Sequence, residues 1–149
     1  MFIQLLFFLF IISFFIAKLE INIEGKGGWA RNLPTWKVKN RLTAVIWGDL
    51  PLTGYHLWLI GSVLLFLHFP FFLGLLWSLG LEFEIIALFF FFWMLEDFFW
   101  FVLNPSYGIR KFNKESIVWH SKWIGRVPIS YVKFFSAGAI MLALSILVV

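Results

Sequence analysis

The sequence predicts an all-α, polytopic integral membrane protein with four transmembrane helices. Its composition is 62% hydrophobic and only 13% charged over 149 residues, whereas soluble domains average roughly 45–50% apolar and about 25% charged residues. Apolar runs recur along the chain, and the longest are long enough for the ~20-residue helix that crosses a bilayer core. All twelve Lys and Arg residues fall in two stretches, 18–41 and 110–133.

The two basic stretches predict the orientation of the chain. Cytoplasmic loops of membrane proteins carry the excess of Lys and Arg, so both stretches are expected on the same, cytoplasmic side. An even number of crossings then places the N- and C-termini outside. The chain, residues 1–149, is expected to form one multi-pass domain of a cell inner membrane, with two basic, Trp-rich cytoplasmic loops.

The first expected span covers residues 2–24, where Lys18 extends its ammonium group to the interface and the glycines from Gly25 onward end the helix. In the first basic loop, Trp29 and Trp36 alternate with Lys and Arg, a pattern that suits the headgroup zone of a bilayer. An interfacial role is the favoured interpretation of these tryptophans. A substrate- or lipid-binding loop is the alternative.

The second and third spans are expected at 54–80 and 82–104, as an antiparallel hairpin. Residues 50–81 contain no charged side chain, so 54–80 is expected to be one tilted helix with a kink at Pro70, because proline removes a backbone hydrogen bond. The sequence Asn104-Pro105 and the residues after it form a strong stop-and-turn signal.

The second basic loop contains Trp119 and His120, and Pro128 suits the first turn of the fourth expected span, 129–149. This span carries small residues that would allow a neighbouring helix to approach closely: Ser136, Ala137, Gly138, Ala139 and Ala143.

Glu96 and Asp97 are the strongest candidates for functional residues. They interrupt a run, 85–104, that is otherwise free of charge, and a carboxylate at the centre of a membrane helix costs roughly 2.5–3.5 kcal/mol on insertion scales. Such residues need a proton, a cation or a hydrogen-bonding partner. Because neighbouring helical residues point about 100° apart, the two carboxylates are not expected to face one small ligand together.

Histidine and further acids are expected at the same depth as this pair. His56, His120, Glu96 and Asp97 are predicted to converge on the cytoplasmic half of the bundle, where Glu20 and Glu24 share one helical face. Imidazole with carboxylate suits Zn, Fe or Mn, so these four residues are the candidate ligands of a divalent metal, and Glu96, Asp97 and His120 the candidate catalytic residues. The alternative gives the histidines interfacial roles, with His68 as a polar contact near Pro70.

Other kinds of site are excluded or disfavoured by the sequence. The absence of cysteine excludes disulfides and thiolate ligands. No phosphate-binding loop motif occurs, and the net charge of +4 is explained by the loops rather than by nucleic-acid binding. The expected partners are the bilayer, anionic lipid headgroups, and either a second copy of the chain or another membrane protein.

Three functions fit these observations. The first is a small membrane enzyme that uses a metal or acid–base chemistry on a lipid-like substrate. The second is a non-catalytic subunit or assembly factor of a membrane complex. The third is a small cation or proton transporter that oligomerises to line its path, although one copy has few spans for this and no internal repeat.

Overall fold

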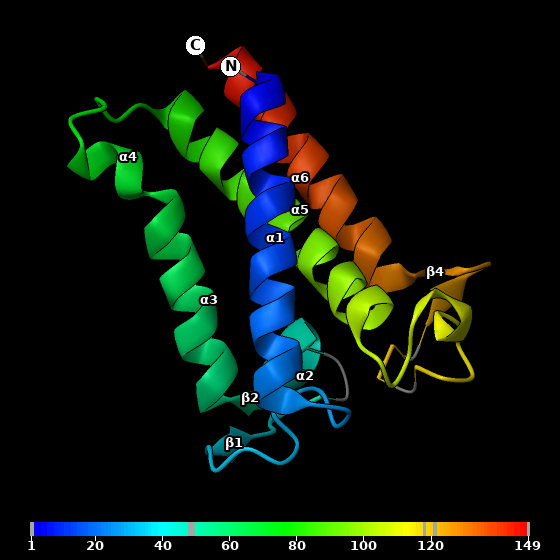
Figure 1. The fold of residues 1–149 in the computed structure, drawn as a ribbon. Coiled ribbons are helices and arrows are strands. Elements are labelled where there is room, and N and C mark those ends of the chain that lie inside the picture. The colour runs from blue at the N-terminus through cyan, green and yellow to red at the C-terminus, as the bar shows by residue number, and fades with distance from the viewer. Residues whose placement is uncertain (1, 48–49, 118, 121, 149) are drawn as a thin grey trace.

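The computed structural model describes residues 2–47, 50–117, 119–120 and 122–148. Three long helices form its centre: α1 (Phe2–Glu24), α5 (Leu79–Leu103) and α6 (Ile129–Leu147) (Figure 1). Each contains a segment long and apolar enough to cross a membrane. The described residues thus form a mostly helical protein with three candidate membrane-spanning helices, which agrees with the predicted class, whereas the count of four stays a prediction.

Helix α5 is the central element, because both α1 and α6 pack against it. Phe92 and Phe101 of α5 are completely buried, and Leu9 of α1 packs into the same core as Phe92. An added Cβ on Gly138 of α6 would come within 2.6 Å of the Phe91 ring. The close approach predicted for the small residues of this helix is thus present at Gly138.

The segment 54–80 is not one kinked helix, so that expectation is wrong. Helix α3 (Gly54–Leu67) stops before His68, a short helix α4 (Phe69–Phe72) follows, and an irregular segment leads to α5. Pro70 occupies the first turn of α4, where its missing N–H is not needed. The 14 residues of α3 extend about 21 Å, less than the ~30 Å hydrocarbon core of a bilayer.

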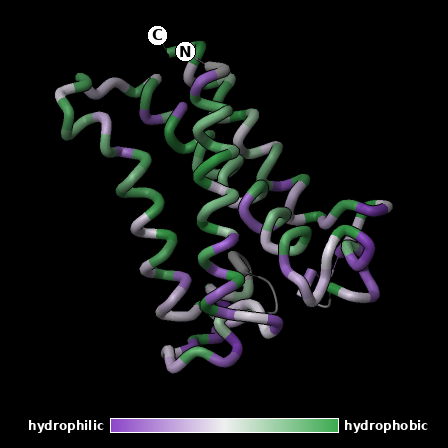
Figure 2. The backbone as a smooth tube through the Cα atoms, viewed as in Figure 1, coloured by the Kyte–Doolittle hydropathy of each residue, from purple (hydrophilic) through white to green (hydrophobic). Residues whose placement is uncertain are grey.

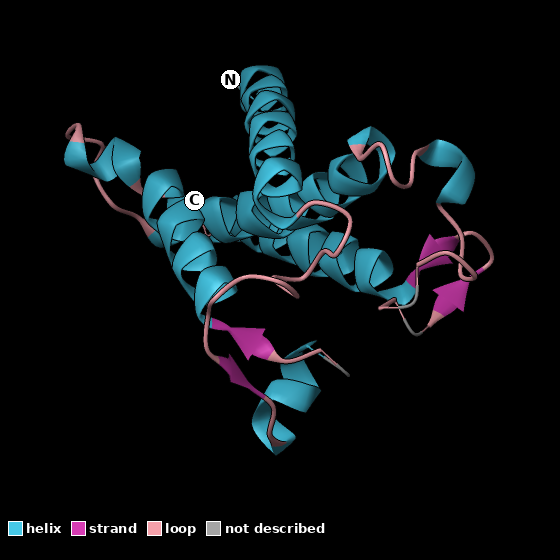
Figure 3. Ribbon diagram, turned by 60° about the horizontal axis from the view of Figure 1, so that its bottom comes forward, coloured by secondary structure: helices cyan, strands magenta, loops and turns pink. Residues whose placement is uncertain are grey.

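Two small antiparallel strand pairs add strands that the all-α prediction did not include. Strand β1 (Lys37–Val38) pairs with β2 (Leu52–Thr53), and β3 (Trp123–Ile124) pairs with β4 (Val127–Pro128) (Figure 3). The short helix α2 (Arg41–Trp47) lies between β1 and β2, and the 3-10 helix η1 (Ile109–Lys111) follows α5. Strand β2 leads into α3 and β4 into α6, so each strand pair positions the start of an apolar helix.

Both basic loops lie at one end of the long helices. Helices α1 and α5 run in the same direction, and both termini lie at the opposite end (Figure 1). The Asn104 side-chain amide donates to the Gly25 carbonyl at 3.1 Å, and the Tyr107 hydroxyl donates to the Lys26 carbonyl at 3.1 Å. Hydrophilic residues gather in these loops, whereas the helices are mainly hydrophobic (Figure 2).

Candidate functional site

The end of α1 contributes two carboxylates to the interior. Glu20 and Glu24 are one helical turn apart, and both are buried. His56, in the first turn of α3, lies beside them, and one ligand atom from each of the three residues lies within 4.8 Å of the other two. These three side chains form the carboxylate–histidine cluster.

Thr53 fixes the position and orientation of His56. Its hydroxyl accepts a hydrogen bond from the His56 backbone N–H at 3.1 Å and thereby caps α3. The same oxygen lies 2.7 Å from Nδ1 of the imidazole, which leaves Nε2 free to face Glu24 Oε1 at 3.8 Å. The indole of Trp29 stacks on the imidazole with a centroid separation of 4.2 Å.

The loop after α1 orients Glu24. Trp29 and Ala30 adopt left-handed conformations, with φ of 48° and 49°, which are uncommon for residues other than glycine. The turn directs the Ala30 N–H to Glu24 Oε1. Backbone strain of this kind is concentrated at functional sites. Here the strained turn supplies the N–H that holds the Glu24 carboxylate.

Glu96 of α5 reaches the same cluster. It is 3% exposed, and its carboxyl group interacts directly with that of Glu20. The Tyr55 hydroxyl also interacts with the Glu20 carboxyl group. One oxygen each of Glu20, Glu96 and Tyr55 is buried without a hydrogen bond of standard geometry among the described residues. Two acidic side chains and a phenol are therefore packed against one another away from water, an arrangement that a proton or a cation stabilises.

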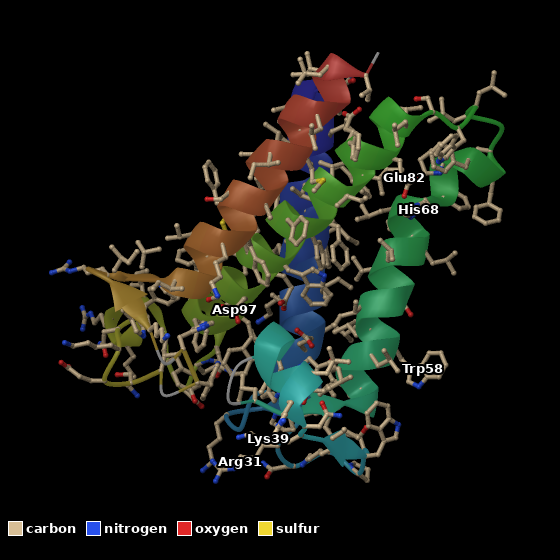
Figure 4. All side chains as sticks on the ribbon, turned by 180° about the vertical axis from the view of Figure 1, so that it is seen from behind. Arg31, Lys39, Trp58, His68, Glu82 and Asp97 are labelled. Atoms are coloured by element: carbon tan, nitrogen blue, oxygen red, sulfur yellow. The ribbon has the colours of Figure 1, made fainter. Side chains whose placement is uncertain are left out.

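Asp97 belongs to a different group of side chains. Its Oδ2 accepts a hydrogen bond from the Tyr131 hydroxyl at 2.5 Å and lies 3.0 Å from His120 Nε2. The other ring nitrogen, Nδ1, lies 3.2 Å from the hydroxyl oxygen of Ser130. Asp97 lies between α5 and α6, away from the loop cations Arg31 and Lys39 (Figure 4). Asp97, His120, Ser130 and Tyr131 form the aspartate–histidine network.

The structure divides the four predicted ligands between these two groups. His56 belongs to the carboxylate–histidine cluster and Glu96 lies against its Glu20, whereas Asp97 and His120 form the aspartate–histidine network. They therefore do not converge on one ion. The separation of Glu96 from Asp97 agrees with the roughly 100° between adjacent helical positions.

Sequence reasoning missed several partners. Thr53 and Tyr55 could have been found from their position beside His56, and the i, i+4 spacing of Glu20 and Glu24 did place both on the correct face. Ser130 and Tyr131 gave no signal, because nothing in their spacing relates them to residues 97 and 120. Only tertiary packing of α6 on α5 brings them together.

The predicted interface residues have structural contacts. Trp119 stacks on Phe101 with a centroid separation of 5.4 Å. Asn104 caps α5, and Pro105 begins the turn that follows. Trp29 donates from its indole to the Pro51 carbonyl at 2.8 Å, whereas Trp36 remains half exposed and covers Gly54, where a Cβ would come within 2.6 Å of its indole nitrogen.

His68 lies outside both groups. Its Nε2 is 3.1 Å from Glu82 Oε1, and its Nδ1 is 2.7 Å from the Leu64 carbonyl oxygen. His68 is thus the polar contact near Pro70 that the alternative interpretation described, with Glu82 as its partner (Figure 4).

The two groups are suited to different chemistry. The carboxylate–histidine cluster offers nitrogen and oxygen ligands in a buried site, as divalent metals such as Zn, Fe and Mn require. The aspartate–histidine network can hold and move a proton. Comparison with protein-family models, with curated proteins and with solved structures found no match to this chain.

Proposed function

We propose that this protein is a four-crossing membrane enzyme that binds a divalent metal through Glu20, Glu24, His56 and Glu96, close to the cytoplasmic surface, and acts on a lipid-like substrate. The observation that carries the proposal is the carboxylate–histidine cluster itself. Three ligand groups from α1 and α3 lie within 4.8 Å of one another, and the buried carboxyl group of Glu96 lies against that of Glu20.

Electrostatics favours a cation at this cluster. Three carboxyl groups buried together repel one another when ionised and lose the hydration that stabilises their charge. A divalent cation would provide the opposite charge and would be bound by the carboxylate oxygens. Its bound water would then be activated for attack on a membrane-soluble substrate.

The surroundings of His56 also favour metal binding. A histidine that binds a metal usually donates its other ring N–H to a fixed acceptor. With a metal on Nε2, Nδ1–H of His56 donates to the Thr53 hydroxyl oxygen 2.7 Å away. The stacked Trp29 ring holds the imidazole plane, so the ligand is already oriented before the ion arrives.

Metal analysis of the purified protein tests this function. We expect about one Zn, Fe or Mn per chain, and at least roughly tenfold weaker binding in Glu24→Gln and His56→Ala, because each removes one ligand. Glu84→Gln and His68→Ala are the matched controls, since neither residue belongs to the cluster. Circular dichroism of each variant tests whether it remains folded.

A wild-type protein that holds no metal after reconstitution would contradict the proposal. Equal affinity in the cluster variants and the controls would contradict it as well.

The aspartate–histidine network favours a second candidate function, acid–base chemistry at the start of α6. With Asp97 ionised, His120 donates from Nε2 to the carboxylate and can accept the Ser130 hydroxyl proton at Nδ1. An adjacent base that is itself oriented by a third group is the arrangement that activates a hydroxyl nucleophile. Ser130 and His120 are both partly exposed, so a reagent can reach them.

A fluorophosphonate probe tests the second candidate without knowledge of the substrate. We expect labelling at Ser130 that is lost in Ser130→Ala and His120→Gln and that persists in Ser136→Ala, a control on the exposed face of the same helix. Labelling should also persist in the presence of a chelator, because the network contains no cluster residue. Failure of the wild-type protein to react would exclude an activated serine.

A further inference from the structure

A cavity of about 430 Å³ lies between η1, the turn after it and the β3–β4 hairpin. Its lining contains three cations, one acid, one amide and a wall of apolar and aromatic groups: Arg110, Lys114, Arg126, Glu115, Asn113, Ile109, Phe112, Trp123 and Gly125. This volume is in the range of small-ligand sites, roughly 300–1,000 Å³. None of its lining residues belongs to the carboxylate–histidine cluster or the aspartate–histidine network.

The three cations come from two separate segments. Arg110 and Lys114 belong to η1 and the turn after it, whereas Arg126 lies in the β3–β4 turn, next to Gly125 with φ of +59°. Among the residues that the structure describes, no Lys or Arg side chain forms an ion pair with a carboxylate. Within the described residues, Arg110, Lys114 and Arg126 are therefore not held in ion pairs, and Glu115 is the one acid in the lining.

Asn113 gives the turn a defined shape. Its side-chain oxygen accepts from the backbone N–H groups of Glu115 at 3.1 Å and Ser116 at 2.9 Å, and its amide donates to the Arg110 carbonyl at 3.4 Å. Phe112 packs edge-on against Trp123, with centroids 5.7 Å apart. The cations therefore project from a braced turn and hairpin rather than from a flexible chain.

The cavity lies where the chain enters an apolar helix. Strand β4 runs directly into α6, which is a candidate membrane span from its first residue, Ile129. Trp123 forms part of the wall, and tryptophan is enriched at the level of the headgroups. A ligand in this cavity would thus lie at the depth of lipid phosphates.

We propose that this cavity binds a phosphate group, with Arg110, Lys114 and Arg126 as its ligands. Arginine matches phosphate geometry through paired N–H donors, and lysine adds a point charge. The phosphate can belong to the headgroup of an anionic lipid or to a soluble phosphate compound. Glu115 is the one acid in the lining, so the three cations leave an excess of two positive charges to balance the charge of the phosphate.

Native mass spectrometry of the full chain in detergent tests the proposal. The probes are phosphatidic acid, phosphatidylglycerol and, without phosphate, diacylglycerol. We expect the two phospholipids to bind and diacylglycerol not to. The double variant Arg110→Gln/Arg126→Gln should weaken phospholipid binding at least roughly tenfold.

Lys39→Gln/Arg41→Gln is the matched control, because it removes the same charge from exposed residues of the other basic loop. Equal losses in the two double variants would mean that charge alone attracts the lipid, and this would overturn the proposal, as would equal binding of diacylglycerol.

Competition identifies the source of the phosphate. Displacement of the lipid by millimolar inorganic phosphate or glycerol 3-phosphate supports a phosphate site that soluble compounds can occupy. Retention of the lipid supports a headgroup site. Either kind of phosphate site depends on Arg110 and Arg126. Neither kind requires a metal in the carboxylate–histidine cluster, so this proposal can fail or succeed independently of the proposed function.

Discussion

Glu96 and Asp97 are neighbours in sequence, yet their side chains serve different groups. Glu96 faces the carboxyl of Glu20 on α1, whereas Asp97 accepts hydrogen bonds from Tyr131 and His120 on the other side of α5. A helix turns by about 100° per residue, so two adjacent acids can supply two sites on one central helix.

Thr53 combines helix capping with ligand orientation, because one hydroxyl group serves both. Thr53→Ala removes the cap of α3 and the partner of His56 Nδ1. We expect a loss of about 1 kcal/mol in the free energy of unfolding and roughly 10–100-fold weaker metal binding. Chemical unfolding in detergent and metal titration measure the two effects. Thr53→Ser should keep the stability and the metal affinity of the wild type, because serine retains the hydroxyl group.

Thr43→Ala is the control for this prediction. Thr43 exchanges backbone and side-chain hydrogen bonds with Asn40 at the start of α2 and does not contact His56. The Thr43→Ala variant should have a lower free energy of unfolding and an unchanged metal affinity. If Thr53→Ala binds metal as well as Thr43→Ala does, Thr53 does not orient a ligand.

At the scale of elements, Glu82 joins the α3–α4 connection to the first turn of α5. His68 Nε2 lies 3.1 Å from Glu82 Oε1, and the Trp77 indole donates to Glu82 Oε2 at 3.0 Å.

We expect His68→Ala and Glu82→Gln each to lower the melting temperature, because each removes one partner of a hydrogen bond that contributes about 1 kcal/mol. Thermal unfolding in detergent measures it. An unchanged melting temperature in both variants would show that the contact does not contribute to stability.

The packing of α6 on α5 gives a second prediction for the helices. A Cβ on Gly138 would come within 2.6 Å of Phe91, whereas nothing lies within 4 Å of one on Gly61 in α3. Gly138→Leu should cost about 1–3 kcal/mol in the free energy of unfolding, because overpacking displaces the ring. Gly61→Leu should not destabilise the protein, and similar losses for both would contradict close packing at Gly138.

At the scale of the whole molecule, α1 and α5 run in the same direction, so the chain between them must return from the end of α1 to the end of the molecule where α5 begins. The Asn104–Gly25 hydrogen bond joins the C-terminal ends of these helices, and both helices begin toward the other end of the molecule (Figure 1). If α1 and α5 both cross a bilayer, residues 25–78 must cross it too. Helices α3 and α4 would then make the crossing as a broken span.

Single-cysteine variants test this topology, since the chain has no cysteine of its own. Lys39→Cys and Lys114→Cys lie in the two basic loops, and Leu76→Cys lies in the exposed segment before α5. We expect an impermeant maleimide to label Leu76→Cys from outside intact cells and the other two only after permeabilisation. Labelling of all three from one side would exclude the broken span.

The sequence by itself determined the long apolar helices α1, α5 and α6, the turn at Asn104 and the presence of acids within apolar helices, because these follow from local composition and charge. It did not determine the break at His68, since proline is compatible both with a kink and with the start of a new helix.

Only the tertiary structure decided which acids share a site. The partners of Asp97 on α6 and those of Glu96 on α1 are distant in sequence, and their meeting depends on how three helices pack around α5. Periodicity fixes the face of one helix on which a residue lies, whereas the rotation and depth of its neighbours come from the packing of whole surfaces.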